Sequence, residues 1–248
     1  MDTESIWQAV SRRLRPGAPL AELDVPDGWL VGAIVAALLV VGVPAVWRVL
    51  RVAVTVVHEL GHAVVGLAVG RKFTGLVLRP DMSGHVVTVG PSRGPGRVVA
   101  TWAGYPAPAL LGLALVWAAY SGWAPPMVFA IALACLAGLL RVRSLYTALV
   151  MILALAGCGW LWWSAEPVVQ GLVLVGVGVV LLLGAWRHLA AVMGRPSRDS
   201  DPAVLGRITP LPTAVWTATF VIVLAVASWL TLEMVAELVD FAALPWNS

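Results

Sequence analysis

Apolar residues fill most of this chain in long runs, and the polar residues between them come in short segments. A transmembrane helix needs about 20 mainly apolar residues. By this measure the sequence predicts an all-α polytopic membrane protein with about seven transmembrane helices. The fourth run is the shortest, and a re-entrant segment is the alternative for it. The expected spans are Trp29 to Trp47, Leu50 to Val69, Val98 to Tyr120, Met127 to Leu140, Leu145 to Trp163, Val168 to Leu189 and Ala214 to Val235.

The segment between the second and third spans, residues 72–90, has a different pattern. Two short β-branched runs, Phe73 to Leu78 and His85 to Val89, flank the turn-rich segment Arg79 to Gly84. This pattern predicts a small β-hairpin at the membrane surface, and an ordinary structured loop is the alternative. A free strand edge here would be able to receive an extended peptide by strand addition.

We expect three parts along the chain. Residues 29–240 form a single transmembrane domain, which includes the hairpin and a polar loop at residues 195–212. Residues 1–28 form an N-terminal amphipathic segment and linker, and residues 241–248 form a C-terminal tail. A short helix on the membrane surface suits the N-terminal segment, and a frayed tail is the alternative. The apolar face of that helix would consist of Ile6, Trp7, Val10 and Leu14.

The composition agrees with a bilayer environment. Of the 248 residues, 60% are hydrophobic and 12% are charged, whereas a soluble domain carries about 25% charged residues. The net charge of +3 does not indicate nucleic-acid binding, because the basic residues are dispersed among short loops. Cys135 and Cys158 lie in apolar runs, which excludes a disulfide framework and a cysteine metal site. No cleavable signal peptide is expected, because the first long apolar run lacks a small-residue cleavage site.

The orientation follows from the loops after the second, fourth and sixth spans, which hold most of the sixteen basic residues. The positive-inside rule predicts that these loops are cytoplasmic, in the inner or plasma membrane of the cell. With seven spans, the N-terminus is also cytoplasmic and the C-terminus lies outside. The basic residues of the three loops are Arg71, Lys72, Arg79, Arg93, Arg97, Arg141, Arg143, Arg187, Arg195, Arg198 and Arg207, and the N-terminal segment adds Arg12, Arg13 and Arg15.

Three ionisable residues stand close together inside the second apolar run. They are His58, Glu59 and His62, in the sequence His-Glu-Leu-Gly-His. Ionisable side chains within a membrane helix are costly and mark functional sites. His58 and His62 are one helical turn apart, so both imidazoles leave the same face. This is the HExxH arrangement, in which two histidines bind zinc and the glutamate is the general base. The alternative is a pair of hydrogen-bonded core histidines beside a protonated Glu59.

A catalytic zinc usually takes three protein ligands and keeps one position open for water. His62 lies about 12 Å before the end of its helix, at 1.5 Å per residue, so the metal is expected within the membrane but near the cytoplasm, and its site is expected to open on that side. A cytoplasmic loop that dips into the protein would be able to carry the third ligand to it.

Two aspartates of the polar loop at residues 195–212, Asp199 and Asp201, are the leading candidates for that ligand. Asp201 suits another role as well, because an aspartate followed by proline is a common N-cap of a helix. Asp81 is a further candidate. His188, at the end of its span, suits an interfacial position, and His85 suits a surface or substrate-groove position.

These features resemble the site-2 protease family of zinc intramembrane metalloproteases, and the compact bacterial branch of it most closely. The resemblance rests on His-Glu-Leu-Gly-His in a membrane helix, the hairpin after it, and the Gly/Pro-containing third span at residues 103–108. In that branch a Ser-Asp-small residue segment, then Leu and a Thr/Pro-containing stretch, precede the final span. The resemblance therefore implies Asp201 as the third zinc ligand, with Asp199 in reserve. The matching residues are Ser200, Asp201, Pro202, Leu205, Thr209 and Pro212.

The resemblance implies a zinc endopeptidase that uses one Zn²⁺ and cuts peptide bonds in or near transmembrane segments of other membrane proteins. The implied partners are such a substrate and the bilayer; the oligomeric state and the substrate-binding residues stay open, and Tyr105 and His188 are candidate oxyanion donors. The Asn-x-x-Pro and Leu-Asp-Gly motifs of better-known members are absent, and the only asparagine is Asn247. This departure supports a catalytically inactive zinc-binding scaffold as the alternative. An ion carrier with buried His and Glu along its pathway is a third alternative.

Overall fold

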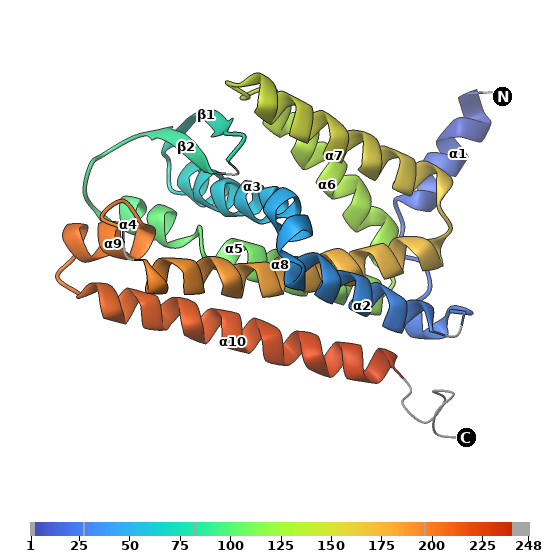
Figure 1. Ribbon diagram of the computed structural model, residues 1–248. Coiled ribbons are helices and arrows are strands. Elements are labelled where there is room, and N and C mark those ends of the chain that lie inside the picture. The colour runs from blue at the N-terminus through green and yellow to red at the C-terminus, as the bar shows by residue number, and fades with distance from the viewer. Residues whose placement is uncertain (1–2, 27, 82, 196, 240–248) are drawn as a thin grey trace.

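The computed structural model describes residues 3–26, 28–81, 83–195 and 197–239. It is mainly helical, with a two-stranded sheet at one end, as the sequence predicted (Figure 1). The predicted tail at residues 241–248 lies outside the described residues. The elements are α1 (Thr3–Arg13), the 3₁₀ helix η1 (Leu20–Glu22), α2 (Trp29–Gly42), α3 (Pro44–Ala68), β1 (Lys72–Leu78), β2 (Gly84–Val89), α4 (Pro95–Trp102), α5 (Pro106–Tyr120), α6 (Ala124–Leu139), α7 (Leu145–Ser164), α8 (Pro167–Gly194), α9 (Asp201–Ile208) and α10 (Thr213–Leu238).

Four of the described helices, α3, α7, α8 and α10, are long and apolar enough to cross a membrane. Together α4 and α5 would make a fifth span, but they meet at an angle of 59°. The apolar helices α2 and α6 are shorter, with 14 and 16 residues. Seven spans are therefore not confirmed: the described chain has four spans, or five if the bent pair crosses as one.

Prolines explain where several helices begin. Pro44 and Pro106 each occupy the first position of their helix, where a missing N–H costs no hydrogen bond. Pro106 therefore breaks the predicted third span into α4 and α5, with residues 103–105 at the bend. Pro44 places the break between the first two apolar runs at Val43, so Arg48, which lies between the two predicted spans, is inside α3.

Helices α2 and α3 follow one another across the molecule instead of forming a helical hairpin (Figure 1). The backbone oxygen of Ala33 lies near Gly176 of α8, and the oxygen of Val41 accepts a hydrogen bond from the Arg187 side chain. These contacts show that α2 runs parallel to α8, because the later residue of α2 contacts the later residue of α8. After the break, α3 crosses α8 at Gly184 and continues to the end of the molecule that carries the β-hairpin.

The N-terminal segment lies at the opposite end of the molecule from the β-hairpin (Figure 1). Arg13 Nη1 donates to the backbone oxygen of Trp162 at 2.6 Å, and the N–H of Gly17 donates to the oxygen of Gly122 at 2.8 Å. The N-terminal segment and the hairpin therefore lie at opposite ends of the molecule, and the side of the membrane that each of them faces stays a prediction.

The tightest helix pair of the core is α5 against α8. A Cβ at Gly112 would lie 2.6 Å from the backbone oxygen of Gly178, and a Cβ at Gly178 would lie 2.7 Å from the oxygen of Gly112. Small residues at both positions let the two backbones approach closely, as in membrane helix pairs generally. A second core cluster, around Leu189, Leu205 and Phe220, fastens α9 to α8 and α10. This cluster holds the N-terminus of α9 beside α3.

The β-hairpin is antiparallel, with Val77 opposite His85 and a register shift between Phe73 and Gly75. The other edge of β1 is also paired: Leu76 N–H donates to the oxygen of Arg141 at 3.0 Å, and Leu76 O accepts from the N–H of Arg143 at 3.1 Å. No backbone hydrogen bond from another described element reaches the outer edge of β2. The predicted hairpin thus exists, and β2 carries its open edge.

Candidate metal centre

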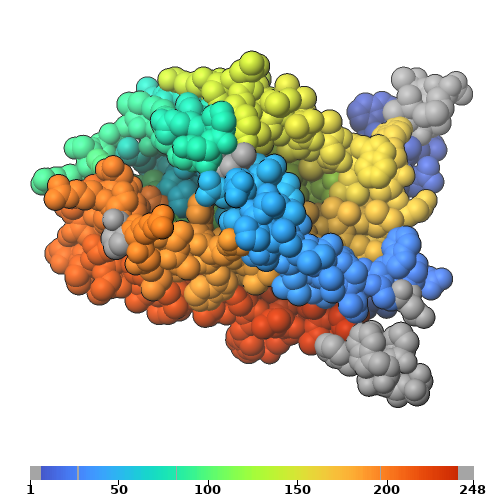
Figure 2. All heavy atoms as spheres, viewed as in Figure 1, coloured from blue at the N-terminus to red at the C-terminus, as the bar shows by residue number. Residues whose placement is uncertain are grey.

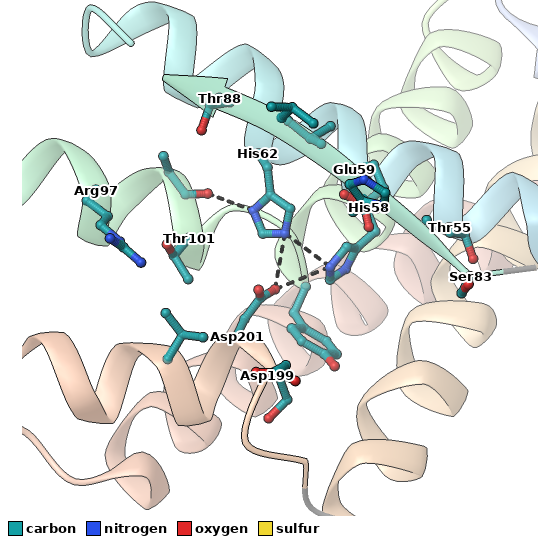
Figure 3. Close-up of a pocket in the computed structure, with 18 of the residues that line it drawn as sticks. Thr55, His58, Glu59, His62, Ser83, Thr88, Arg97, Thr101, Asp199 and Asp201 are labelled. Carbon is teal, nitrogen blue, oxygen red and sulfur yellow. Dashed lines mark hydrogen bonds and ion pairs between the residues drawn. The ribbon is translucent and has the colours of Figure 1, made fainter. Parts of the chain in front are cut away.

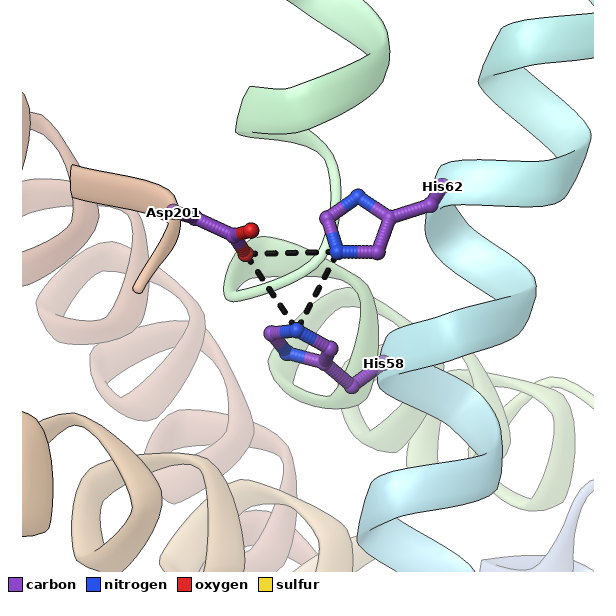
Figure 4. A group of neighbouring side chains, drawn as sticks. All are labelled: His58, His62 and Asp201. Carbon is purple, nitrogen blue, oxygen red and sulfur yellow. Dashed lines mark hydrogen bonds and ion pairs between the residues drawn. The ribbon is translucent and has the colours of Figure 1, made fainter. Parts of the chain in front are cut away.

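The two histidines of the predicted zinc motif meet on one face of α3 (Figure 4). His58 and His62 are four residues apart, and their Nε2 atoms lie 3.2 Å from each other. Both side chains are mostly buried, with exposed fractions of 13% and 16%. The rings point away from the helix toward a third side chain, which comes from a distant part of the sequence.

That third side chain belongs to Asp201, the first residue of α9 (Figure 4). Its Oδ2 lies 3.2 Å from His58 Nε2 and 3.3 Å from His62 Nε2. Ser200 occupies the N-cap position instead, so the carboxylate of Asp201 is free to point at the histidines. Asp199, the reserve candidate, is exposed and does not belong to this group. The predicted ligand role of Asp201 stays a prediction, and its position fits that role.

The geometry of the three ligand atoms fits a zinc ion. Ligands at 2.0–2.1 Å from a tetrahedral zinc lie about 3.3 Å from one another, and the three atoms here form a triangle with edges of 3.2, 3.2 and 3.3 Å. The donor set of two imidazoles and one carboxylate is one that catalytic zinc uses. Among the described residues, the buried Oδ2 of Asp201 has no partner besides these two rings.

The electrostatics keep the Asp201 carboxylate in the form that binds a metal. Burial by itself would raise the pKa of the Asp201 carboxyl group, but hydrogen bonds from His58 and His62 outweigh it. The pKa of this carboxyl therefore lies well below its usual value. A metal ligand has to be deprotonated, so Asp201 is ready to coordinate a cation.

The orientation of His62 is set by α4. Its Nδ1 lies 2.7 Å from the backbone oxygen of Ala100. A carbonyl oxygen can only accept, so Nδ1 carries a proton, and Nε2 is the ring nitrogen that faces Asp201. A hydrogen bond of this kind orients a metal-binding histidine and raises its basicity. Nothing in the sequence singled out Ala100, because a backbone carbonyl leaves no signature in the residue type.

The bend between α4 and α5 passes directly against the two histidines. A Cβ at Gly104 would lie 2.4 Å from both Cε1 and Nε2 of His62, and 2.7 Å from Nε2 of His58. Only glycine fits at this position without moving the rings. The Gly/Pro content of the third span was visible in the sequence, but not that Gly104 touches the site.

Glu59 lies beside the metal ligands, on the side that faces the hairpin (Figure 3). Its residue is buried, with an exposed fraction of 8%. The nearest point of the hairpin is Gly84 at the start of β2, where a Cβ would lie 3.1 Å from Cγ of Glu59. The predicted base thus borders the same space as the two histidines, next to the open strand edge.

A cavity of about 820 Å³ covers the candidate metal centre. The surface is hollowed between the hairpin and the segment that contains the end of α8 and α9 (Figure 2). The first five residues of β2, from Gly84 to Thr88, border this cavity, together with α3, α4 and the loop before α9. Its lining includes Thr55, His58, Glu59, His62, Arg71, Gly84, His85, Val86, Val87, Thr88, Arg97, Thr101, Tyr105, His188, Asp199 and Asp201.

The remaining candidates lie in different places. The ring of His188 is 5.7 Å from the ring of His58, and the ring of Tyr105 is 4.9 Å from it, so both border the site. His188 was expected at the membrane interface; the structure instead packs its ring against that of His58. His85 lines the cavity on β2. Asp81 lies in the hairpin turn, where its carboxylate accepts from the N–H and Oγ of Ser83 at 2.9 and 2.6 Å.

Comparison with known proteins gives one result. The family model described as Peptidase M50B-like matches residues 31–231, which include α3, the hairpin, the bend at Gly104 and the N-terminus of α9. Searches of curated proteins and of solved structures found no match. Because the family model matches most of the chain, the match establishes which family the chain belongs to. The resemblance drawn from the HExxH motif is confirmed: the chain belongs to the Peptidase M50B-like family, a site-2 protease family.

Proposed function

We propose that this protein is a zinc-dependent intramembrane endopeptidase that hydrolyses peptide bonds in or near transmembrane segments of other membrane proteins. The observation that carries the proposal is the triangle of His58 Nε2, His62 Nε2 and Asp201 Oδ2, which has the dimensions of a tetrahedral zinc site. Glu59 lies beside it, in a cavity large enough for a peptide segment. Family membership supports a metalloprotease.

The catalytic roles follow from the chemistry of these side chains. A zinc ion bound here lowers the pKa of a coordinated water to about 7 and polarises a nearby carbonyl group. Glu59 accepts the proton of the attacking water and returns it to the leaving nitrogen as the peptide bond breaks. His58, His62 and Asp201 hold the metal, and Ala100 fixes the ring of His62 through its carbonyl oxygen. Gly104 leaves the space in which the two imidazoles converge.

The substrate has to be extended at the bond that is cut, because a transmembrane helix hides its peptide groups in internal hydrogen bonds. The outer edge of β2 offers unpaired backbone groups beside the cavity, where an extended segment can add as a strand. The backbone of β1 cannot serve in this way, because β2 pairs with one of its edges and the backbone of Arg141 and Arg143 pairs with Leu76 on the other. Strand addition at β2 therefore presents the substrate backbone to Glu59.

We propose a location in the cell membrane with the hairpin end toward the cytoplasm. The loops at that end, which contain Arg71, Arg141 and Arg195 among others, carry most of the basic residues. The active-site cavity then opens on the cytoplasmic side. Because the N-terminal segment lies at the opposite end, both it and the C-terminal end of α10 face the outside in this orientation.

The direct test uses the purified protein in liposomes with a single-span membrane protein as the substrate. Wild-type protein loaded with one equivalent of zinc should produce a cut product, and Glu59→Gln should bind zinc equally well and produce none. If Glu59→Gln yields the product at the wild-type rate, the proposed mechanism is wrong. If no product forms with any of a panel of single-span substrates, the peptidase proposal fails.

The second candidate is a catalytically inactive membrane scaffold that binds zinc and a membrane segment. The absence of the Asn-x-x-Pro and Leu-Asp-Gly motifs favours it, and the single asparagine, Asn247, lies outside the described residues. The scaffold would hold the same segment at β2 with equal affinity in wild-type protein and in Glu59→Gln. A cut product that depends on Glu59 excludes it.

A further inference from the structure

One end of the cavity is cationic. Five basic residues lie between α3 and α4 or at the start of α4, and only Arg71 and Arg97 are half-buried and line the cavity. Lys72, Arg79 and Arg93 are exposed and do not border it. The positive-inside rule explains why basic residues occur in this segment, but it does not explain why two of them turn inward.

These two arginines lie beyond one end of the metal centre. Arg97 lies on α4, one turn before Ala100, whose carbonyl oxygen binds His62. Figure 3 shows Arg97 and Thr101 on one side of the metal ligands and Ser83 and Thr55 on the other. A segment that follows β2 past the metal therefore has one end at the arginines.

The second arginine, Arg71, contacts β2 near its C-terminal end. Its Nε donates to Oγ1 of Thr88 at 3.4 Å, and its Nη1 donates to the backbone oxygen of Pro91 at 2.8 Å. From Gly84, beside Glu59, to Thr88 is four residues, or about 13 Å at 3.3 Å per residue. Gly84, the strand residue beside Glu59, and Thr88, the strand residue that Arg71 contacts, are thus only four residues apart.

Neither arginine has an acidic partner. Within the described residues, no carboxylate lies within ion-pair distance of either guanidinium group. Each guanidinium has five N–H donors, and the hydrogen bonds to backbone and hydroxyl oxygens occupy two donors of Arg71 and one of Arg97. The remaining donors are left for a ligand. Two half-buried cations in one recess favour an anionic group there, and the planar guanidinium suits a carboxylate.

We propose that Arg71 and Arg97 form a subsite for a carboxylate of the substrate, on the order of two to four residues from the bond that is cut. The inference rests on the proposed peptidase function and specifies its substrate class: an extended membrane segment with an acidic residue close to the cut. A substrate aspartate or glutamate at the cytoplasmic end of its helix meets this requirement, because that end lies at the membrane surface.

The test compares substrate pairs that differ only in charge. A single-span substrate carries aspartate or asparagine at the second, third or fourth residue from the cut, on either side, and kcat/KM is measured for each pair. We expect aspartate to be preferred roughly tenfold at one of these positions, the size expected for a hydrogen-bonded charge pair. Arg97→Gln should reduce this ratio to about one, and Arg97→Glu should reverse it in favour of asparagine.

Arg93→Gln is the matched control, because Arg93 is an exposed arginine in the same segment and should leave the ratio as in wild type. Arg71→Lys is the second variant, since lysine keeps the charge but loses the planar fork; it should lower the ratio less than Arg97→Gln. Zinc content and thermal unfolding of each variant verify that the site is intact.

Binding is measured separately in the Glu59→Gln background, in which no cleavage is expected. A fluorescent peptide of the substrate segment with aspartate should bind roughly tenfold more tightly than the asparagine peptide, and Arg97→Gln should remove the difference. Peptides that end at the same position as a free acid or an amide show whether a chain terminus can supply the carboxylate instead. If only the free-acid peptide binds more tightly, the carboxylate in the subsite comes from a chain terminus and not from an aspartate side chain.

The two proposals fail in different ways. If cleavage depends on Glu59 but aspartate and asparagine substrates react equally in wild-type protein, the carboxylate subsite is wrong and the peptidase stands. If Arg97→Gln changes binding to anionic lipid vesicles but not the substrate ratio, the arginines bind lipid and the subsite is also wrong. If Glu59→Gln cleaves like wild type, the peptidase function fails whatever the ratio.

Discussion

The hairpin end and the N-terminal end of this molecule differ in the kinds of side chain that form them. At the hairpin end, polar side chains from α3, α4 and α9 converge on a cavity. At the N-terminal end, Leu20 is buried against Gly171, and the backbones of Gly17 and Gly122 are hydrogen-bonded. Exposed tryptophans gather at this second end: Trp7, Trp29, Trp117, Trp123, Trp160 and Trp163.

The difference indicates separate roles: the hairpin end carries the candidate site, and the N-terminal end is suited to anchoring in the membrane. Tryptophans concentrate at membrane interfaces, where an apolar ring with one polar group is stable, so the N-terminal end has a composition that is typical of a bilayer surface. Buried side-chain atoms without a hydrogen-bond partner occur at both ends of the described chain: Nδ1 of His58 and of His188 at the hairpin end, and Nε1 of Trp162 at the N-terminal end. Buried polar groups of this kind cost stability. Substitutions at the hairpin end should therefore change catalysis or zinc binding. Substitutions at the N-terminal end should change the free energy of unfolding.

The largest effect is expected for Glu59→Gln at the hairpin end. The amide cannot accept a proton from water, so kcat/KM should fall by about 10²- to 10⁴-fold, the usual contribution of a general base. The zinc content should stay at one equivalent, because Glu59 is not among the three converging ligands. Rates of product formation and metal analysis on the same sample test both statements.

The next largest effect is expected for Asp201, the first residue of α9, and it is compared with Asp199 in the preceding loop. Asp201→Asn removes the carboxylate that meets the histidines, and zinc affinity should fall on the order of a hundred- to a thousandfold. Asp199→Asn is the matched control, since Asp199 is exposed and outside the ligand group, and it should keep its zinc. Competition with a zinc chelator measures both affinities. Equal affinities in the two variants would remove Asp201 from the site.

At the N-terminal end, Leu20→Ala should lower the free energy of unfolding by about 2–3 kcal/mol, because a buried leucine is replaced by a cavity. Leu20 is 2% exposed and packs against Gly171 and not against a metal ligand. Zinc affinity should equal that of wild type. If Leu20→Ala weakens zinc binding, the two ends are coupled, and the separation of function from anchoring does not hold.

The smallest effects come from a pair of glycines. Gly104→Ala places a methyl group against both histidines and should lower zinc affinity by roughly tenfold, because an overpacked site costs 1–3 kcal/mol. Gly159→Ala on α7 has open space around it and should stabilise the helix by about 0.5–1 kcal/mol without changing zinc affinity. Chelator competition and denaturant unfolding of both variants provide the comparison.

The membrane class and two of the metal-binding side chains were predictable because they depend on short-range regularities. Apolar runs identify membrane helices by length and composition, and the spacing of His58 and His62 puts both rings on one helix face whatever surrounds it. The hairpin was predictable for the same reason, from two β-branched runs around a turn. The seven spans were not confirmed, because run length does not reveal that Pro106 begins a new helix within one run or that the helices α2 and α6 are shorter than a span.

Tertiary structure decided which groups meet. Asp201 lies far along the sequence from the histidines, and local rules suited it equally to cap a helix; its carboxylate reaches them because α9 is fastened to α8 and α10. The Ala100 carbonyl and the space at Gly104 depend on where α4 and α5 bend against α3. The sequence by itself determined the membrane environment and the paired imidazoles, since helical periodicity is local. Packing between distant helices completed the site and placed the two ends of the chain, since such contacts depend on the whole path of the backbone.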